Sequence, residues 1–113
     1  MFPYGIVACA YMERTHIGEV KQHIGQQVAI AGFVQVIRDQ GSIKFLVVRD
    51  ISDIIQIVIT KDKPEVLKIV ESLTLESVVE ITGLAKEERQ APGGFEIGAE
   101  SIMVLSLAEP ELP

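Results

Sequence analysis

The sequence predicts a small all-β domain, a closed barrel of five strands with one α-helix between the third strand and the fourth. Two observations carry this prediction. Apolar and polar residues alternate over five separate stretches, which is the period of a β-strand. Between the third and fourth stretches, apolar residues recur at helical spacing instead. With 113 residues, the chain is long enough to bury a core without a disulfide or a metal.

The five strands are expected in segments rich in Val, Ile and Phe that turn residues separate. Residues 39–42 and 92–94 are such turns. Glycines inside two of the strands, Gly32 and Gly98, indicate a bulge or a sharp bend. A short helical turn is expected over 17–23, before the first strand. The strands are predicted over residues 28–38, 43–50, 54–60, 78–86 and 95–105.

The predicted helix runs from Pro64 to Leu73. Proline is favoured in a first helical turn, and Asp62 or Lys63 precedes it as a candidate cap. Three strands, a helix and two strands, in this order, are typical of the OB-fold, a Greek-key barrel with a helix at one end. The number of strands also allows an SH3-like barrel, and the helix decides for the OB-fold. Its apolar stripe consists of Val66, Leu67, Val70 and Leu73.

The chain divides into an extension over 1–12, the folded domain over 13–108 and the start of a linker over 109–113. The net charge is −6, and residues 61–113, with five basic and eleven acidic residues, carry the whole excess. Such a charge disfavours a protein that binds nucleic acid without regard to sequence, because that binding depends on neutralising phosphates. The neutral half, residues 1–60, can still meet RNA.

Several other classes of protein are disfavoured. Cys9 is the only cysteine, so no disulfide forms within the chain, as is typical of a reducing, cytoplasmic protein. The longest apolar run is too short to span a membrane, and residues 1–11 lack the basic start of a signal peptide. His16 and His23 have no partners at metal-ligand spacing. No phosphate-binding loop or nucleophile motif indicates catalysis, and no cofactor is expected in this domain.

Strand parity separates an inner face from an outer face. The outer face is expected to carry Phe45, Arg49, Gln56 and Glu96. An exposed ring beside amide, guanidinium and carboxylate groups suits base recognition, because the ring stacks on a base while polar groups read its edge. Each residue alone also fits a plain surface role. The residues expected inside are Leu46, Val48, Ile55, Ile57, Ile59, Phe95 and Ile97.

The sequence resembles the anticodon-binding domain of class IIb aminoacyl-tRNA synthetases, the aspartyl, asparaginyl and lysyl enzymes. It looks most like the archaeal-type aspartyl-tRNA synthetases, through Arg14-Thr15-His16, Leu75-Glu76-Ser77-Val78-Val79, Gly94-Phe95-Glu96-Ile97 and the closing residues 108–113. The segments that carry the wider resemblance are Gly32-Phe33-Val34, Arg38-Asp39-Gln40-Gly41, Lys44-Phe45-Leu46-Val47-Val48-Arg49-Asp50 and Ile55-Gln56-Ile57-Val58.

The resemblance implies a role for each matching residue. Phe45 stands where a ring stacks on the middle anticodon base, a uridine, and Gln56 where an amide hydrogen-bonds that uridine. Glu96 matches a carboxylate that contacts the anticodon bases from the last strand. Arg38 and Gln40 match positions that contact the outer anticodon bases and the backbone.

Two further positions bear on the third anticodon base. Enzymes of this type that accept only aspartate tRNA tend to carry a Trp on the first strand and a Lys in the loop before the last strand. This chain has Gln35 and Pro92 at those places. Proline has no charged tip and glutamine offers both a donor and an acceptor, so we expect relaxed reading that also admits asparagine tRNA.

The family's enzymes carry, after this barrel, a class II catalytic domain that binds ATP and magnesium and allows a homodimer. The chain lacks those motifs, so the resemblance implies an aspartate–tRNA ligase domain that binds tRNA and does not itself aminoacylate it. Two alternatives stay open: a free-standing OB protein that binds single-stranded nucleic acid, and a module that docks a protein partner. Binding to tRNA, to a scrambled loop and to pyrimidine-rich DNA separates them.

Overall fold

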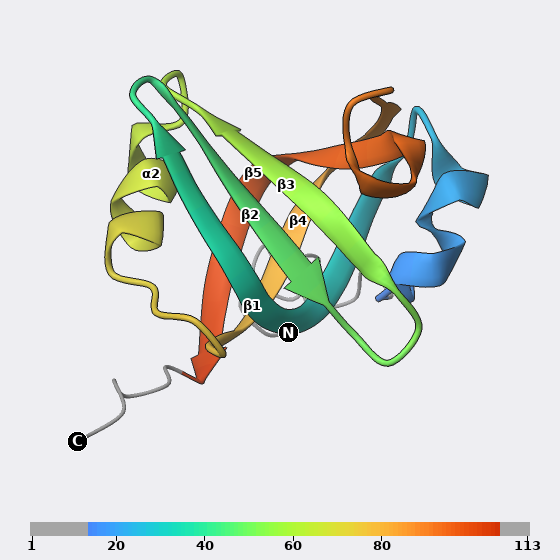
Figure 1. Cartoon of the computed structure of the whole chain (residues 1–113), viewed down its shortest axis with the longest axis horizontal. Helices are drawn as coiled ribbons and strands as arrows, with labels where there is room; N and C mark the ends of the chain where they lie inside the picture. Colours follow the sequence, from blue (N-terminus) through green and yellow to red (C-terminus); the bar gives the residue numbers. More distant parts are fainter. Residues whose placement is uncertain (1–13, 107–113) are drawn as a thin grey trace, which may run out of the picture.

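Five strands close into a barrel in the order β1-β2-β3-β5-β4 (Figure 1). The computed structural model describes residues 14–106, so the expected extension over 1–12 and linker over 109–113 lie outside the described residues. All neighbouring strands are antiparallel except β3 and β5, which run parallel and close the barrel. The strands are β1 (Gln27–Gln40), β2 (Ile43–Arg49), β3 (Ile54–Thr60), β4 (Val78–Glu87) and β5 (Phe95–Ser106).

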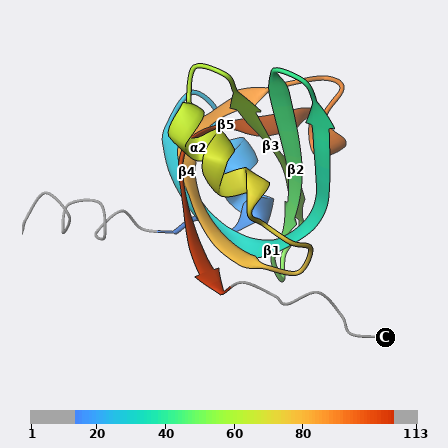
Figure 2. The ribbon, with the colours of Figure 1, turned by 90° about the vertical axis from the view of Figure 1, so that its left-hand side faces the viewer.

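The predicted OB-fold is confirmed, because the only α-helix of the described residues lies between β3 and β4. This helix, α2 (Pro64–Glu71), covers one end of the barrel, and the 3₁₀ turn η1 (Ile17–His23) lies at the opposite end (Figures 1 and 2). Pro64 stands in the first turn as predicted, whereas Lys63, the N-cap, makes no side-chain cap hydrogen bond. The helix ends before Leu73, which is nevertheless buried.

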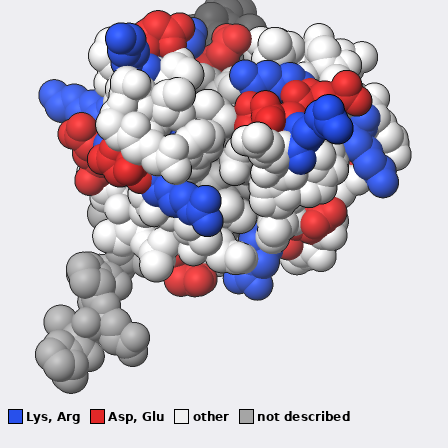
Figure 3. All heavy atoms as spheres, turned by 45° about the horizontal axis from the view of Figure 1, so that its top comes forward, with Lys and Arg blue, Asp and Glu red and all other residues white. Residues whose placement is uncertain are grey.

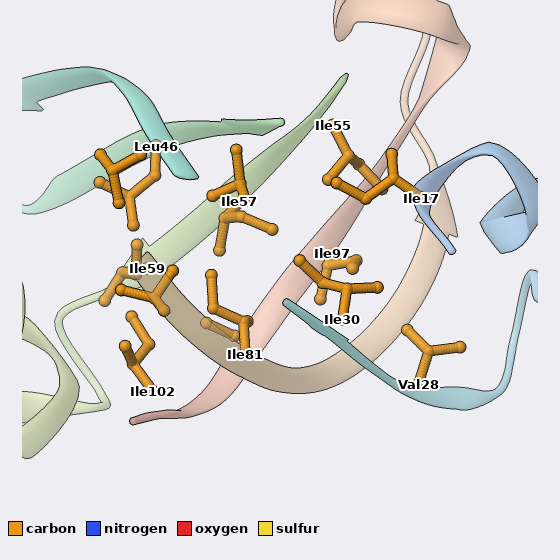
Figure 4. Packing of buried hydrophobic residues seen from close by; sticks show 14 of the residues in the cluster. Ile17, Val28, Ile30, Leu46, Ile55, Ile57, Ile59, Ile81, Ile97 and Ile102 are labelled. Atoms are coloured by element: carbon orange, nitrogen blue, oxygen red, sulfur yellow. The ribbon is translucent and has the colours of Figure 1, made fainter. Parts of the chain in front are cut away.

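The barrel is filled by aliphatic side chains from every strand and from η1, which point toward one another in Figure 4. All seven residues predicted to lie inside are buried. Burial of this much apolar surface is the main source of stability, at about 25 cal/mol per Å². The core therefore lies inside the barrel, and side chains on the outer face are available for other roles.

The two strand glycines mark irregularities, as expected, although the bulges themselves lie a few residues further on. In β1 the pairing with β2 shifts between Val34 and Val36, which makes Gln35 the extra residue. A Cβ at Gly32 would lie 2.4 Å from the carbonyl oxygen of Arg49. Gly32 is therefore needed for close approach of two backbones rather than for the bulge.

The second irregularity follows the same rule. The pairing of β4 with β5 shifts between Thr82 and Gly83, opposite Ser101 and Ala99, which makes Glu100, two residues after Gly98, the extra residue. Here it is Gly83 on β4 that cannot carry a side chain, because its Cβ would lie 2.2 Å from the Gly98 carbonyl oxygen. Both shifts increase local twist, which a five-stranded sheet needs in order to close.

A short η2 (Pro92–Gly94) precedes β5 and belongs to the loop that follows β4. Gly93 and Gly94 both have positive φ, 76° and 87°, which explains why the loop uses glycine there. The N–H of Glu88 donates to the Gly94 carbonyl, and the N–H of Gly94 donates to the Ala91 carbonyl, so the loop is internally bonded. It is this loop that borders the outer face described next.

Candidate nucleic-acid interface

The outer face of the barrel carries two neighbouring rows of side chains that cross the strands. Within each row, every residue is the register partner of its neighbour on the adjacent strand. The first row runs from β1 to β4 through Val36, Val47, Gln56, Glu96 and Lys86. The second row lies one side-chain step along the strands and runs through Arg38, Phe45, Val58 and Gly98.

Phe45 and Gln56 are diagonal neighbours across β2 and β3, on the same outer face, as strand parity predicted. Both side chains are half-buried, whereas Ile57, next to Gln56, is fully buried in the core. A ring and an amide thus lie within reach of one planar ligand, which can stack on the first and be read at its edge by the second.

The position of Glu96 differs from the prediction of an exposed outer carboxylate. Glu96 belongs to the outer face by register, but its side chain is only 7% exposed. Its Oε1 accepts a hydrogen bond from Nε2 of Gln56 at 2.9 Å. Its Oε2 lies 3.6 Å from Nζ of Lys86. The neighbours in its row flank the carboxylate on both sides, so little of it is exposed, although Glu96 still borders the hollow described next.

Five of the seven predicted site residues line one hollow of about 390 Å³. The hollow opens on the outer face between β1, β2, β3 and the loop before β5. Its lining includes one guanidinium, three amides, two carboxylates and one aromatic ring. The predicted residues that line it are Arg38, Gln40, Phe45, Gln56 and Glu96.

The other two predicted residues lie elsewhere. Pro92 lines an adjoining hollow of about 300 Å³ that shares Arg38, Phe45 and Gln56 with the first. Gln35, the exposed bulge residue of β1, lines neither hollow. Of the two positions expected at the third anticodon base, the structure therefore brings only Pro92 beside the ring and the amide.

The loop before β5 supplies two lining residues that the sequence reasoning missed. Glu88 lines the larger hollow, and Gln90 lines both hollows. The N–H of Gln90 donates to Oε2 of Glu88 at 3.2 Å, which ties the two together. The polar stretch between β4 and β5 indicates a loop that contains Glu88 and Gln90. Nothing in the spacing of its residues shows that this loop bends over the outer face.

The charged residues that line the hollow are of both signs, with Arg38 basic and Glu88 and Glu96 acidic, and the charges elsewhere on the barrel are also mixed. Lys44 pairs with Asp39 at 2.7 Å, and Arg49 lies over the ring of Phe33, 5.7 Å from its centroid. The hydrogen bond from Lys44 and that from the N–H of Gly41 hold the pKa of Asp39 below its usual value. On the face shown in Figure 3, basic and acidic groups are interspersed among uncharged surface, and neither sign forms a continuous patch.

Phe33 is a second outer aromatic, 43% exposed, whose orientation the sequence left undecided. It lines a different, mostly apolar hollow, together with Ile51 and Leu105, and not the one that holds Phe45. Within residues 14–106 no group of three His, Cys, Asp or Glu residues is placed to hold a metal ion. No helix in that part of the chain is long and apolar enough to cross a membrane.

Comparison with known proteins bears on this face. Residues 28–105 match the tRNA anticodon family, whose description is an OB-fold nucleic acid binding domain. The chain is 44% identical over 102 residues to an aspartate–tRNA(Asp/Asn) ligase of Methanocorpusculum labreanum, covering 88% of this chain and 24% of that protein. It is 42% identical over 106 residues to an aspartate–tRNA(Asp) ligase of Thermococcus kodakarensis, covering 90% and 24%.

A solved structure has the same architecture. Asparaginyl-tRNA synthetase from Pyrococcus horikoshii superposes with a TM-score of 0.79 at 31% sequence identity, covering 86% of this chain and 23% of that one. The chain thus spans about a quarter of the length of the curated relatives it matches.

Proposed function

The chain belongs to the family of OB-fold nucleic acid binding domains, and we propose that it recognises the anticodon loop of a tRNA on the outer face of its barrel. The observation that supports this proposal is the hollow that holds Phe45, Gln56 and Arg38 together. It combines a stacking surface, a polar reader and a cation in the space of a few nucleotides.

Anticodon bases suit such a hollow because a loop can splay them out of the helical stack. Proteins that recognise RNA sequence usually bind bases in this state, stacking them on an aromatic ring. Phe45 supplies the ring, and a stacked base contributes about 1–3 kcal/mol. In this proposal the base is the middle base of the anticodon, a uridine.

The polar groups divide into base readers and positioning groups. Gln56 hydrogen-bonds the edge of the stacked uracil, because its amide is the polar group that lies diagonally beside the ring. Arg38 and Gln40, at the end of β1, contact the outer anticodon bases and the phosphate backbone. A single guanidinium in a hollow of mixed charge fits selective binding better than binding driven by bulk positive charge.

The third anticodon base is proposed to lie toward Pro92, while Gln35, which lines neither hollow, is left for a contact outside them. Pro92, at the rim of the adjoining hollow, has no charged tip, and Gln35 can present either a donor or an acceptor. Neither side chain demands cytosine. We therefore propose that the domain accepts the GUC anticodon of aspartate tRNA and the GUU anticodon of asparagine tRNA.

In the whole protein, this domain is proposed to serve an aspartate–tRNA ligase of the cytoplasm. Because the chain spans 24% of such relatives, aminoacylation, with its ATP and magnesium, is assigned to a class II catalytic domain that this chain does not contain. On this view the 113 residues bind tRNA but do not charge it.

A direct binding comparison tests the proposal. The 113-residue chain is titrated with an anticodon stem-loop bearing GUC, the same stem with a scrambled loop, and an oligo-pyrimidine DNA of equal length, all at one salt concentration. Preference for the GUC loop supports anticodon recognition. Equal binding to all three indicates a general single-strand binder, and binding to none overturns the proposed recognition of the anticodon.

A further inference from the structure

The row that crosses β3, β5 and β4 contains an arrangement that base recognition alone does not explain. Gln56 and Glu96 are register partners in the parallel pair β3–β5, and Glu96 and Lys86 are partners in the antiparallel pair β5–β4. An amide, a carboxylate and an ammonium thus stand in line, with the carboxylate between the other two. It is 7% exposed, against 47% for the side chain of Lys86.

Both oxygens of this buried carboxylate face partners within the protein. Oε1 accepts from Nε2 of Gln56 at 2.9 Å, and Oε2 lies 3.6 Å from Nζ of Lys86. An ionised carboxylate has no hydrogen to donate, so it can face only the N–H₂ side of the glutamine amide. The amide of Gln56 is therefore held with its nitrogen toward Glu96.

The held orientation decides what the amide offers to a ligand. Because Nε2 of Gln56 donates to Glu96, the carbonyl oxygen Oε1 of the amide remains available to accept a hydrogen bond from a ligand. Gln56 lines the hollow in which such a ligand would lie. An acceptor pairs with a base that has an imino N–H at its Watson–Crick edge, as uracil does at N3 and guanine at N1. Cytosine and adenine carry an acceptor at that position, so the two lone pairs would repel each other.

We propose that Glu96 is a positioning residue that fixes the Gln56 amide with its carbonyl oxygen toward the ligand, and that it thereby selects uracil over cytosine at the stacked base. This inference rests on the proposed anticodon-binding function. It gives Glu96 a role beyond the expected direct contact with the anticodon, because its two oxygens already face Gln56 and Lys86. The base is read by Gln56, and Glu96 acts through it.

Substitution of the carboxylate by an amide separates this role from a structural one. In Glu96→Gln the new side chain offers an oxygen or an N–H₂ group to Gln56, so the Gln56 amide can turn over and present its nitrogen. Binding is measured with anticodon stem-loops that have U or C at the middle base. We expect the wild-type chain to prefer U by about tenfold or more, as a well-placed polar pair does, and Glu96→Gln to reduce that preference to about threefold or less.

Three further variants frame the result. Glu100→Gln is the matched control, because it removes an equal charge from an exposed residue of the same strand, whose carboxylate pairs with Gln27 and not with Gln56. It should keep the U preference. Glu96→Asp keeps an acceptor-only group and should keep most of the preference. Gln56→Leu removes the amide that contacts the base, and it gives the ratio of U to C binding expected without discrimination.

A second measurement needs no RNA. In the NMR spectrum of the free chain, a Gln56 side-chain N–H₂ proton bonded to a carboxylate should resonate downfield of the other glutamine amides, and the shift should disappear in Glu96→Gln. If Glu96→Gln does not fold, the chemical shift of the Gln56 side-chain N–H₂ proton is measured on the wild-type chain and on Glu96→Asp instead. A wild-type Gln56 resonance at the position of a solvated amide overturns the inference.

The outcomes distinguish this inference from the proposed function. A folded Glu96→Gln that keeps the wild-type ratio of U to C binding overturns the positioning role and leaves anticodon recognition intact. A wild-type chain that binds neither loop above the scrambled control overturns the proposed function, and the selection of uracil with it. Loss of the ratio in Glu96→Gln, with retention in Glu100→Gln, supports the inference.

Discussion

The backbone N–H of Ile17 donates to Oδ2 of Asp50 at 2.9 Å, across 33 positions of sequence. The first residue of η1 is thus capped by a carboxylate from the end of β2, since its own N-cap, His16, makes no side-chain cap hydrogen bond. The other oxygen, Oδ1, accepts from the N–H and the hydroxyl of Ser52 and from the N–H of Asp53. One carboxylate therefore fastens η1 to the turn between β2 and β3.

We predict that Asp50→Asn lowers the free energy of unfolding by about 1–3 kcal/mol at pH 7, the usual cost of leaving partly buried donors without a charged acceptor. Burial opposes ionisation of Asp50, but hydrogen bonds from Ile17, Ser52 and Asp53 outweigh it and hold its pKa below the ordinary 3.8. A lowered pKa stabilises the fold above the unfolded-state pKa, and this contribution is lost as the pH falls through the folded-state pKa.

Urea denaturation at pH 7 and at successive values below pH 4 measures this effect. The stability of the wild-type chain should fall over that acidic range more steeply than that of Asp50→Asn. Asp53→Asn is the control, since Asp53 is exposed and its carboxylate accepts only locally, from the N–H of Ile54. Equal denaturation midpoints for Asp50→Asn and wild type would show that the cap does not contribute.

The close approach of β1 to β2 yields a second prediction. Gly32→Ala should destabilise the fold by about 1–3 kcal/mol or more, because its Cβ would lie 2.4 Å from a backbone oxygen that cannot move alone. Gly98→Ala is matched to it, since the nearest atom to a Cβ there is the flexible Lys86 Nζ at 3.5 Å. Thermal unfolding of both variants compares them directly, and similar melting temperatures would contradict the prediction.

The third prediction concerns stacking. Phe45→Ala should weaken binding to a GUC anticodon stem-loop by about 1–3 kcal/mol, the usual contribution of one stacked base. Its effect on stability should be small, because the ring lies on the outer face and is half-buried. Phe33→Ala is the control, another outer aromatic that lines a different hollow. A collapse of stability in Phe45→Ala, with unchanged binding per folded molecule, would make Phe45 a structural residue.

The fourth prediction concerns the third anticodon base. Stem-loops with GUC and GUU should bind within about 1 kcal/mol of each other, below the cost of a wrong base at a well-placed polar contact. Pro92→Lys should raise the preference for GUC, because a flexible ammonium at the rim of the adjoining hollow can donate to the cytosine acceptor. Isothermal titration at one salt concentration measures both. A strong wild-type preference for GUC would leave Pro92 as a loop residue only.

Sequence periodicity was sufficient for the strands, the helix and the side of the sheet on which Phe45 and Gln56 lie, because the strand period of two leaves little freedom. It did not predict the burial of Glu96. Parity says which way a side chain points, whereas burial depends on what stands beside it. The neighbours of Glu96 come from strands 40 and 10 positions away, and only the pairing of β5 with both reveals them.

The bend of the loop over the outer face and the exact position of the β1 bulge escaped prediction for a related reason. Gln90 reaches the hollow because the loop bends back over β1 to β3, and internal hydrogen bonds and two glycines with positive φ, rather than a periodic pattern, set that bend. The bulge lies three positions after Gly32 because the glycine relieves a backbone contact, and the sheet absorbs the twist further on.

Because β3 pairs with β5, the order of synthesis decides when the candidate site can form. Ribosomes deliver the chain from the amino terminus, so β1, β2, β3 and α2 emerge before β4, and β5 follows last of the strands. Until β5 inserts, the amide of Gln56 has no carboxylate beside it and turns freely. The proposed anticodon-binding surface and the closed barrel therefore form in the same step, when β5 pairs with β3 and β4.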